Sequence, residues 1–363
     1  MPTNIEGIGT ANPPFSKSQR EAAAFLKRVE GMPESVRSRI DVIHDRSAIE
    51  RRFTCISDYN REPADYEFYP PNASMQPPPS TAARNAMYRK WAPVIAEQAA
   101  RKALAESGRD ADEITHLIVV SCTGFYSPGV DVHLVRSLKL RPTTERTMIG
   151  FMGCYAAFNA MKTAHAICGS NPAARVLIVC VELCTLHFQP VTTLESAVVS
   201  ALFADGAAAA VMSATPDEAQ SGLRYVDSMS LLDGDSLGDM TWDIGDTGFL
   251  MTLSARVPAV IERHLCAFVD QLTRCNGISA SDIKFWAIHP GGRQILDRAA
   301  SVLEMPTDAL AESYGVLREY GNMSSPTILF ILERMRARNV AKGYGVALAF
   351  GPGLTIEGCL LRA

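Results

Sequence analysis

Blocks of apolar and polar positions along the chain predict a protein in which helices and strands alternate. Five short apolar runs are typical of strands buried on both faces: 117–122, 176–181, 207–212, 285–288 and 346–350. Apolar residues at helical spacing mark five longer segments: 20–31, 34–46, 82–107, 257–275 and 327–337. A further segment, 154–168, is apolar nearly all round, so we expect this helix inside the protein.

The longest predicted helix carries signals at both ends. Ser80 and Thr81 are suited to cap a helix that spans 82–107, and Gly108 is suited to end it. The preceding stretch, 63–79, is rich in Pro, Tyr and Asn, and we interpret it as an excursion over the surface.

The second half of the chain resembles the first in its order of elements. Helix 82–107 and strand 117–122 have counterparts in helix 257–275 and strand 285–288. Such a repeat predicts two mostly parallel sheets that pack around shared helices.

A polar stretch at 214–221 separates these halves. We expect an N-terminal half at 1–216, which contains the buried helix 154–168, and a C-terminal half at 217–363. A chain of 363 residues is long enough for two such units, each with a sizeable core.

Composition places the chain among globular proteins and narrows its partners. Hydrophobic residues make up 47% and charged residues 20%, which argues against a disordered chain. With 35 basic and 39 acidic side chains, the net charge of −4 lacks the basic character of a nucleic-acid-binding protein.

The location of the protein is indicated by what its sequence lacks. No apolar run approaches the roughly 20 residues that a membrane-spanning helix needs. Residues 1–14 lack the basic and apolar segments of a secretory signal. Nine cysteines, an odd number, are typical of buried thiols rather than of a disulfide framework. We therefore expect a cytoplasmic protein.

Cys154 is the first candidate for chemistry. It follows a Gly-Phe-Met-Gly turn at 150–153, where the chain enters the buried helix. The unpaired N–H groups at a helix N-terminus favour the thiolate, which is the nucleophilic form of cysteine. The alternative is a small apolar side chain in a core helix.

His289 is the second candidate. It follows strand 285–288 and begins a His-Pro-Gly-Gly turn. The carboxyl ends of strands are where α/β proteins build their sites. On its own, such a histidine is also typical of a protein core.

Asn322 lies in a polar turn before the last apolar helix. Ser324 or Ser325 fits the N-cap of that helix, with Pro326 at its first position, so the Asn322 amide is free for another role. Together the cysteine, histidine and asparagine supply a nucleophile, a base that can hold the thiolate as an ion pair, and an amide donor for an oxyanion.

Other clusters allow more than one interpretation. Five arginines form either a solvated face or a site that captures a phosphorylated acyl carrier: Arg37, Arg39, Arg46, Arg51 and Arg52. Cys180, Cys184 and His187 have a spacing that suggests zinc, but a fourth ligand is missing and the segment is predicted as a buried strand. The turn around Gly351 and Gly353 is better suited to line a pocket than to bind phosphate, because no Lys or Ser follows.

Five motifs in order resemble the type III polyketide synthases, the chalcone-synthase-like branch of the thiolase superfamily, over essentially the whole chain. The motifs are GFMGC at 150–154, ALFADGAA at 201–208, IHPGG at 288–292, YGNMSS at 320–325 and FGPGLTIE at 350–357. The resemblance implies a five-layered αβαβα thiolase-like fold built from two similar halves, and a cytosolic homodimer. It also implies an acyl-CoA starter, malonyl-CoA extenders, and no bound metal or redox cofactor.

The resemblance implies roles for residues in these motifs. Cys154 is the expected acylated nucleophile, and His289 and Asn322 are expected to hold the thioester carbonyl while malonyl-CoA loses CO2. Phe203 is the expected gate between a CoA tunnel and the cavity.

Other positions depart from the family pattern. Arg39 and Arg46 fall where the family places lysines for the CoA phosphates, and Val42 occupies a third such position. Met251 stands in place of a second gating phenylalanine. His187 lies near a cavity position that is often threonine in plant members.

Segments 184–190 and 240–246 resemble bacterial members, which often take fatty acyl starters and release alkylpyrones or alkylresorcinols. The expected function is iterative decarboxylative condensation of malonyl-CoA onto a fatty acyl-CoA, followed by cyclisation.

Two alternatives are a single-condensation ketoacyl synthase of the fatty-acid-initiating type and a catalytically silent thiolase-fold subunit. The Pro-Gly-Gly run after His289 argues against the first, and the intact trio argues against the second. The starter, the number of extensions, the mode of ring closure and delivery by an acyl carrier protein are left open.

Overall fold

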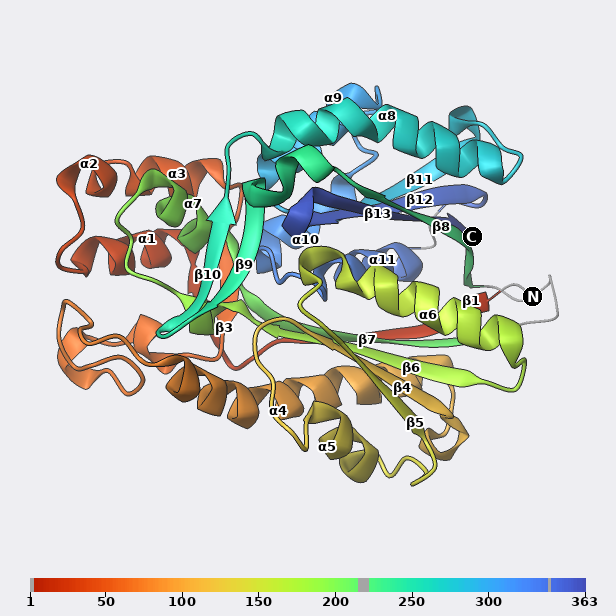
Figure 1. Ribbon diagram of the computed structural model, residues 1–363, viewed down its shortest axis with the longest axis horizontal. Helices are drawn as coiled ribbons and strands as arrows, with labels where there is room; N and C mark the ends of the chain where they lie inside the picture. Colours follow the sequence, from red (N-terminus) through yellow and green to blue (C-terminus); the bar gives the residue numbers. More distant parts are fainter. Residues whose placement is uncertain (1–2, 215–221, 339–340) are drawn as a thin grey trace.

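The computed structural model describes residues 3–214, 222–338 and 341–363 and shows five layers of helices and strands (Figure 1). Two layers of strands alternate with three layers of helices. The central layer consists of α6 (Ala156–Ser170) and α11 (Thr327–Ala337), both largely buried. This arrangement confirms the expected αβαβα architecture.

The N-terminal half forms one layer of five strands. These are β1 (Thr3–Ala11), β4 (His116–Ser121), β5 (Glu145–Gly150), β6 (Arg175–Leu183) and β7 (Asp205–Ala214). Their order in space is β1-β7-β6-β4-β5. The outer face of this layer is covered by two helices, α4 (Thr81–Ser107) and α5 (Val130–Ser137).

The C-terminal half repeats this order with four strands. These are β8 (Leu223–Leu232), β11 (Ile283–Ile288), β12 (Tyr344–Gly351) and β13 (Thr355–Arg362). These strands lie in the order β11-β12-β13-β8, where the first pair is parallel and the other two pairs are antiparallel. The strands β4-β6-β7-β1 of the N-terminal half show the same sequence of pairings. The halves are therefore similar in topology. The helices of the C-terminal half outside the central layer are α8 (Val257–Cys275), α9 (Arg293–Val302) and α10 (Ala311–Tyr320).

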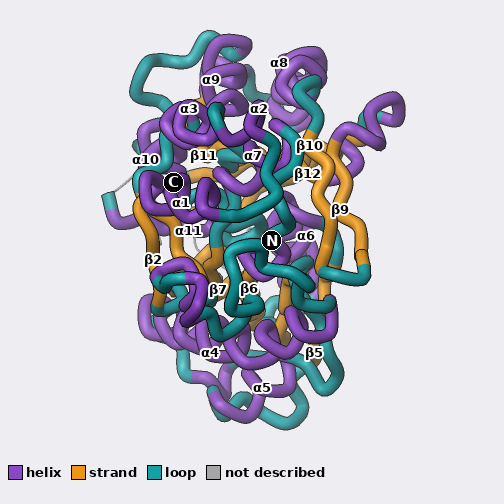
Figure 2. Tube along the Cα trace, turned by 90° about the vertical axis from the view of Figure 1, so that its left-hand side faces the viewer, coloured by secondary structure: helices purple, strands orange, loops and turns teal. Residues whose placement is uncertain are grey.

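The remaining helices and strands lie mainly at one end of the layers, which faces the viewer in Figure 2. They are β2 (Phe15–Ser18), α1 (Gln19–Arg28), α2 (Glu34–Arg37), α3 (Ile40–Arg46), β3 (Arg51–Thr54), α7 (Leu194–Leu202), β9 (Met240–Gly245) and β10 (Gly248–Leu253). β2 pairs with β3, and β9 pairs with β10, in two antiparallel ribbons.

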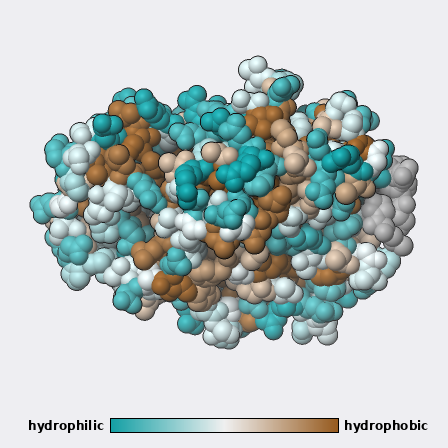
Figure 3. Space-filling model, turned by 45° about the horizontal axis from the view of Figure 1, so that its top comes forward, coloured by the Kyte–Doolittle hydropathy of each residue, from teal (hydrophilic) through white to brown (hydrophobic). Residues whose placement is uncertain are grey.

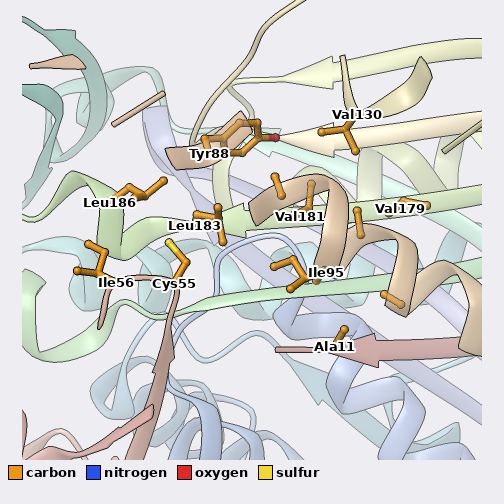
Figure 4. Close-up of a cluster of buried hydrophobic side chains, with 14 of the residues drawn as sticks. Ala11, Cys55, Ile56, Tyr88, Ile95, Val130, Val179, Val181, Leu183 and Leu186 are labelled. Atoms are coloured by element: carbon orange, nitrogen blue, oxygen red, sulfur yellow. The ribbon is translucent and has the colours of Figure 1, made fainter. Parts of the chain in front are cut away.

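The long helix α4 lies very close to β1. A Cβ on Gly9 would lie 2.3 Å from the Ala99 carbonyl oxygen, so only glycine permits this approach. Nearer the start of α4, Tyr88 belongs to the apolar cluster that includes Val179 and Val181 of β6 (Figure 4). This cluster holds α4 against the strands whose carboxyl ends carry the site.

The ends of α4 confirm the sequence prediction. The Ser80 hydroxyl accepts the Ala83 N–H (3.2 Å), and Gly108 ends the helix in the left-handed conformation.

The predicted cap of α11 is wrong, because Pro326 occupies the N-cap and Ser325 instead donates its hydroxyl to Glu182 (2.7 Å).

Two predictions about the larger elements are also wrong. The strands do not form two mostly parallel sheets. β1 also pairs with β8, which joins the two layers into one nine-stranded sheet, and β7 and β13 each run antiparallel to both of their neighbours. The segment 34–46 forms two short helices, α2 and α3, instead of one. The Arg37 side chain donates to the carbonyl oxygens of Lys27 and Val29, which ties the end of α2 back to α1.

The stretch 63–79 is not a simple surface excursion. Tyr66, Tyr69 and Met75 are buried, and the Tyr69 ring lies edge-on to Phe188 at 6.2 Å. Aromatic side chains bury large apolar areas, which holds this stretch against the N-terminal half. The predicted boundary at 214–221 falls almost entirely outside the described residues.

None of the helices that the structure describes is both long and apolar enough to cross a bilayer. On the face shown in Figure 3, hydrophobic patches are interrupted by hydrophilic residues.

Candidate active site

Cys154 lies in a single 3₁₀ turn, Gly153–Tyr155, that leads directly into α6. Gly153 has a φ of +72°, and a Cβ there would lie 2.4 Å from the Pro352 ring, so this turn requires glycine. The Cys154 side chain is buried, and burial raises the pKa of its thiol to about 11. Burial therefore outweighs the helix-terminus effect that the sequence suggests.

His289 directly follows β11 and is fully buried. Its backbone N–H donates to the Leu348 carbonyl oxygen (2.8 Å), whereas neither ring nitrogen has a hydrogen-bond partner among the described residues. Burial lowers the pKa of His289 to about 3. Burial thus acts against the charged form of each group, because apolar surroundings penalise charge.

The side-chain amide of Asn322 has a fixed orientation. Its Oδ1 accepts the Ser324 N–H (2.8 Å) and lies 3.9 Å from the Cys154 sulfur. Its Nδ2 donates to the Gly291 carbonyl oxygen (3.4 Å), two residues after His289. One N–H of the amide is left to donate to another group.

The backbone of Phe203 is held from two sides. It forms a short parallel bridge with Asn322, and the neighbouring Ala204 N–H donates to the Asn322 carbonyl oxygen (2.8 Å). The Arg52 Nη1 donates to the carbonyl oxygens of Ser200 (2.8 Å) and Phe203 (2.7 Å). Arg52 is therefore a structural residue at the site and does not belong to a solvated face.

Two cavities meet at Cys154. The larger cavity, about 530 Å³, is lined by residues that include Arg46, Gly291, Gly292 and Asn322. The smaller cavity, about 120 Å³, is lined mainly by apolar and aromatic side chains. Four residues line both cavities: Cys154, Phe203, Met240 and Met251.

The carboxylate of Glu182 joins the walls of the site. It is fully buried and accepts the Cys122 N–H (3.0 Å) and the hydroxyls of Thr123 and Ser325 (2.7 Å each). Burial raises the pKa of Glu182 to about 6 in spite of these donors. The carboxylate thus connects the ends of β4 and β6 to the segment that carries Asn322.

His187 ties the β9–β10 ribbon to the wall of the smaller cavity. Its Nδ1 accepts the Phe249 N–H (3.0 Å), so its Nε2–H must donate to the Thr123 carbonyl oxygen (2.7 Å). The His187 ring stacks on Phe249 at 4.1 Å, and the Trp242 indole donates to the Cys122 carbonyl oxygen (2.7 Å).

Comparison with known proteins decides the family. The family models "Chalcone and stilbene synthases, N-terminal domain" and "C-terminal domain" match residues 2–216 and 230–363. The chain belongs to the chalcone and stilbene synthase family. It is a type III polyketide synthase, an acyltransferase with a thiolase-like fold, as the resemblance implied.

Similar proteins cover nearly the whole synthase. The Alpha-pyrone synthesis polyketide synthase-like Pks18 of Mycobacterium tuberculosis is 34% identical over 98% of this chain and 90% of its own. The crystal structure of PKS-I from the brown alga Ectocarpus siliculosus has a TM-score of 0.94 at 33% identity, over 99% and 98% of the two chains. The C-terminal type III domain of Steely1, a type I/III hybrid from Dictyostelium, has a TM-score of 0.90 at 29% identity, over 100% and 99%.

Most of the predicted pocket residues of the synthase lie near Cys154. Phe203 and Met251 are at the junction of the two cavities, and Arg46 lines the larger one. Arg39 occupies the N-cap of α3 and is exposed, and it lines none of the cavities found among the described residues.

The glycine-rich loop contributes differently from the prediction. Its cavity-lining residues are Phe350 and Pro352. Gly351 permits the close approach of the Tyr155 ring, because a Cβ there would lie 2.6 Å from it. Gly353 is not among the lining residues and has no pocket role in the structure.

The zinc interpretation of Cys180, Cys184 and His187 receives no support. Both ring nitrogens of His187 are engaged in hydrogen bonds to the backbone. In the described part of the chain, no group of three or more His, Cys, Asp or Glu side chains is placed to hold a metal ion.

Some site residues of the synthase escaped the sequence analysis. Glu182 could have been found as an acid inside an apolar strand, where an ionisable group requires several donors. Trp242 and Phe249 carry no comparable signal, because their place in the cavity depends on how the β9–β10 ribbon folds back.

The tautomer of His187 predicts a pH effect on stability. Burial lowers the pKa of His187 from 6.5 to about 4, so between these values the unfolded chain binds a proton that the folded chain does not. The contribution of His187 to stability is complete above pH 6.5 and is lost as the pH falls to about 4. A shift of this size corresponds to about 3 kcal/mol.

Urea unfolding at pH 7 and pH 4 measures this contribution. Glutamine can both donate and accept hydrogen bonds but does not titrate, so the free energy of unfolding should fall by about 3 kcal/mol less in His187→Gln than in the wild type. His133→Gln, at a partly exposed site beside Glu97, is the control and should behave like the wild type. Equal falls in all three proteins would contradict the assignment.

Proposed function

We propose that this synthase condenses malonyl-CoA units iteratively, with loss of CO2, onto an acyl-CoA starter and then cyclises the product. The proposal is carried by one observation. The buried sulfur of Cys154 lies 3.9 Å from the amide of Asn322 at the point where two cavities meet. We also propose that the half at 1–216 supplies this nucleophile, while the half at 217–363 supplies His289 and Asn322.

In the first step, Cys154 takes the acyl group from the starter. As the sulfur attacks the thioester carbonyl carbon, the neutral imidazole of His289 accepts the thiol proton. The tetrahedral intermediate then collapses, the bond to the CoA sulfur breaks, and the proton leaves with free CoA. The high pKa of Cys154 and the low pKa of His289 suit this coupled transfer, because no separated charges precede attack.

In the second step, malonyl-CoA loses CO2 beside the acylated cysteine. The electrons of the broken C–C bond move into the thioester, and its oxygen becomes an enolate. The remaining N–H of the Asn322 amide and the ring N–H of His289 can donate to this oxygen. Buried polar groups normally have hydrogen-bond partners, so the unpartnered imidazole supports this role.

In the third step, the enolate carbon attacks the acyl carbon on Cys154. The cysteine sulfur leaves as thiolate and takes up a proton from water, because His289 passed the thiol proton to CoA in the first step. The lengthened chain remains on CoA for another cycle. We propose that cyclisation releases an alkylpyrone or alkylresorcinol. The name of the Mycobacterium tuberculosis relative refers to alpha-pyrone synthesis, which supports the pyrone in particular.

The cavities support CoA thioesters as substrates. Arg46 lines the larger cavity, where its guanidinium can bind CoA phosphates, with Arg39 nearby on α3. The smaller cavity has an apolar lining that includes Phe188, Trp242 and Phe249, which suits a fatty acyl starter. All nine cysteines are free thiols, which supports work in the cytoplasm. We propose that the enzyme uses no cofactor beyond these substrates.

Replacing Cys154 by alanine tests the proposed function. We expect wild-type protein incubated with a fatty acyl-CoA to gain the mass of the acyl group, and Cys154→Ala to gain none. With malonyl-CoA added, the wild type should release a cyclic product of several extensions, and the variant none.

Cys168→Ala is the matched control, because this buried cysteine lies on α6, the helix that directly follows the Cys154 turn, but lines neither cavity. It should form the adduct like the wild type. An adduct on Cys154→Ala would refute the nucleophile, and a single β-ketoacyl product from the wild type would favour a fatty-acid-initiating synthase.

We further propose that two copies pair through β5. This strand lies at the edge of the sheet, and Met148 on it is 48% exposed. The exposed ring of Phe125 lies 5.6 Å from that of Phe151 in the loop that follows β5. Open strand edges with apolar side chains are normally covered, and a twofold axis lets the same edge cover itself.

Sedimentation of Met148→Arg tests the dimer. We expect a particle of twice 39.4 kDa for the wild type and a 39.4 kDa monomer for the variant, because a buried arginine pair would face itself across the axis. Leu250→Arg, at a residue of 46% exposure on another ribbon, should remain a dimer. A wild-type monomer would contradict the proposal.

A further inference from the structure

A third cavity lies next to the smaller cavity, and we name it the Lys17 cavity. It has a volume of about 40 Å³ and extends to α1, where Phe25 and Leu26 contribute apolar walls. It shares five lining residues with the smaller cavity: Arg52, Tyr59, Thr185, Phe188 and Ser200. The Lys17 cavity and the smaller cavity, which reaches Cys154, therefore adjoin at these residues.

The ammonium group of Lys17 has no anionic partner. It lies 5.4 Å from the centre of the Phe25 ring, and no carboxylate of the described residues is within ion-pair distance. The two carboxylates whose charge acts on it are engaged elsewhere. Glu21 closes the N-terminal cap of α1, and Glu62 pairs with Arg28 (2.8 Å).

Arg52, on the shared wall, is also a cation without a carboxylate partner. Its Nε and Nη1 donate to neutral oxygens only, among them the Gln19 amide (2.9 Å), and its Nη2 has no acceptor among residues 3–214, 222–338 and 341–363. The charge of Asp205 acts on Arg52, but this carboxylate accepts its hydrogen bonds from Thr185 and the Cys55 N–H.

Both cations are held in surroundings that penalise charge. Burial lowers the pKa of Lys17 to about 8 and that of Arg52 to about 10, so both groups remain mainly protonated near neutral pH. A half-buried and a fully buried cation at one small cavity are stabilised when an anion with hydrogen-bond acceptors enters it. Of the anions that fit beside apolar walls, a carboxylate on a methylene chain matches this lining best.

We propose that the Lys17 cavity binds a carboxylate. Its source is either the far end of a starter chain whose thioester reaches Cys154, or a free carboxylate from solution. The first source would make ω-carboxyacyl-CoA thioesters, the mono-CoA esters of dicarboxylic acids, the preferred starters. This inference rests on the proposed function, because it assigns the acyl chain to the smaller cavity.

Binding of two thioesters to Cys154→Ala tests the inference without turnover. Isothermal titration would compare an acyl-CoA and an ω-carboxyacyl-CoA of equal chain length. We expect tighter binding of the ω-carboxyacyl-CoA, and a loss of about tenfold for that ligand alone when Lys17→Met is added. Methionine keeps an apolar stem of similar length, so the folded structure should be retained.

Lys90→Met is the matched control, because Lys90 also lies over an aromatic ring, that of Trp91 at 5.5 Å, but is exposed and lines none of the three cavities. It should leave both affinities unchanged. A different result would assign the site to a free carboxylate. In that case the two thioesters would bind equally well, a free dicarboxylate would weaken their binding, and Lys17→Met would remove this weakening.

Equal binding of both thioesters together with no effect of free dicarboxylate would overturn the inference. Turnover by the protein with Cys154 intact separates this result from failure of the proposed function. Condensation of the plain acyl-CoA with malonyl-CoA would leave the proposed function standing in that case. A preference in binding with no condensation of any thioester would uphold the carboxylate site and overturn the proposed function.

Discussion

The buried carboxylate of Glu182 is the contact on which the site depends. It collects donors from Cys122 and Thr123 at the end of β4 and from Ser325 in the C-terminal half. Because an ionisable group in the core is tolerated only with several donors, these segments are held together at one point. The Ser325 contact in turn fixes the turn in which the Ser324 N–H orients the Asn322 amide.

Burial also decides the chemistry of the site. The same apolar surroundings that strengthen hydrogen bonds to a developing charge favour neutral groups before the reaction begins. Burial raises the pKa of Cys154 to about 11 and lowers that of His289 to about 3, which acts against a charge on either group before the reaction. In the proposed mechanism, charge develops as the thioester is attacked, and the Asn322 amide is already oriented to meet it.

The sequence predicts much of the fold because its strongest signals are local. Helix 257–275 and the caps at Ser80 and Gly108 follow from side-chain periodicity and backbone preference, and the structure has them as predicted. The motifs likewise lead to Cys154 and Asn322. Periodicity does not predict that β7 and β13 run antiparallel to their neighbours, because strand direction depends on pairing between distant segments.

The parts of the site that the sequence did not predict also depend on contacts between distant segments. The position of the β9–β10 ribbon depends on single contacts between distant segments, such as the His187 bridge from Thr123 to Phe249. The pKa shifts of the site also depend on burial, which a motif does not reveal. A helix-terminus rule applied to Cys154 takes no account of burial, which raises the pKa of its thiol.

Release of CO2 from malonyl-CoA tests the central claim most directly, that the Asn322 amide meets the oxygen of the thioester. In Cys154→Ala, where condensation is blocked, we expect CO2 release to continue. Adding Asn322→Leu should slow it about 10²-fold, because the enolate oxygen loses a positioned donor. An undiminished rate in the double variant would contradict the account.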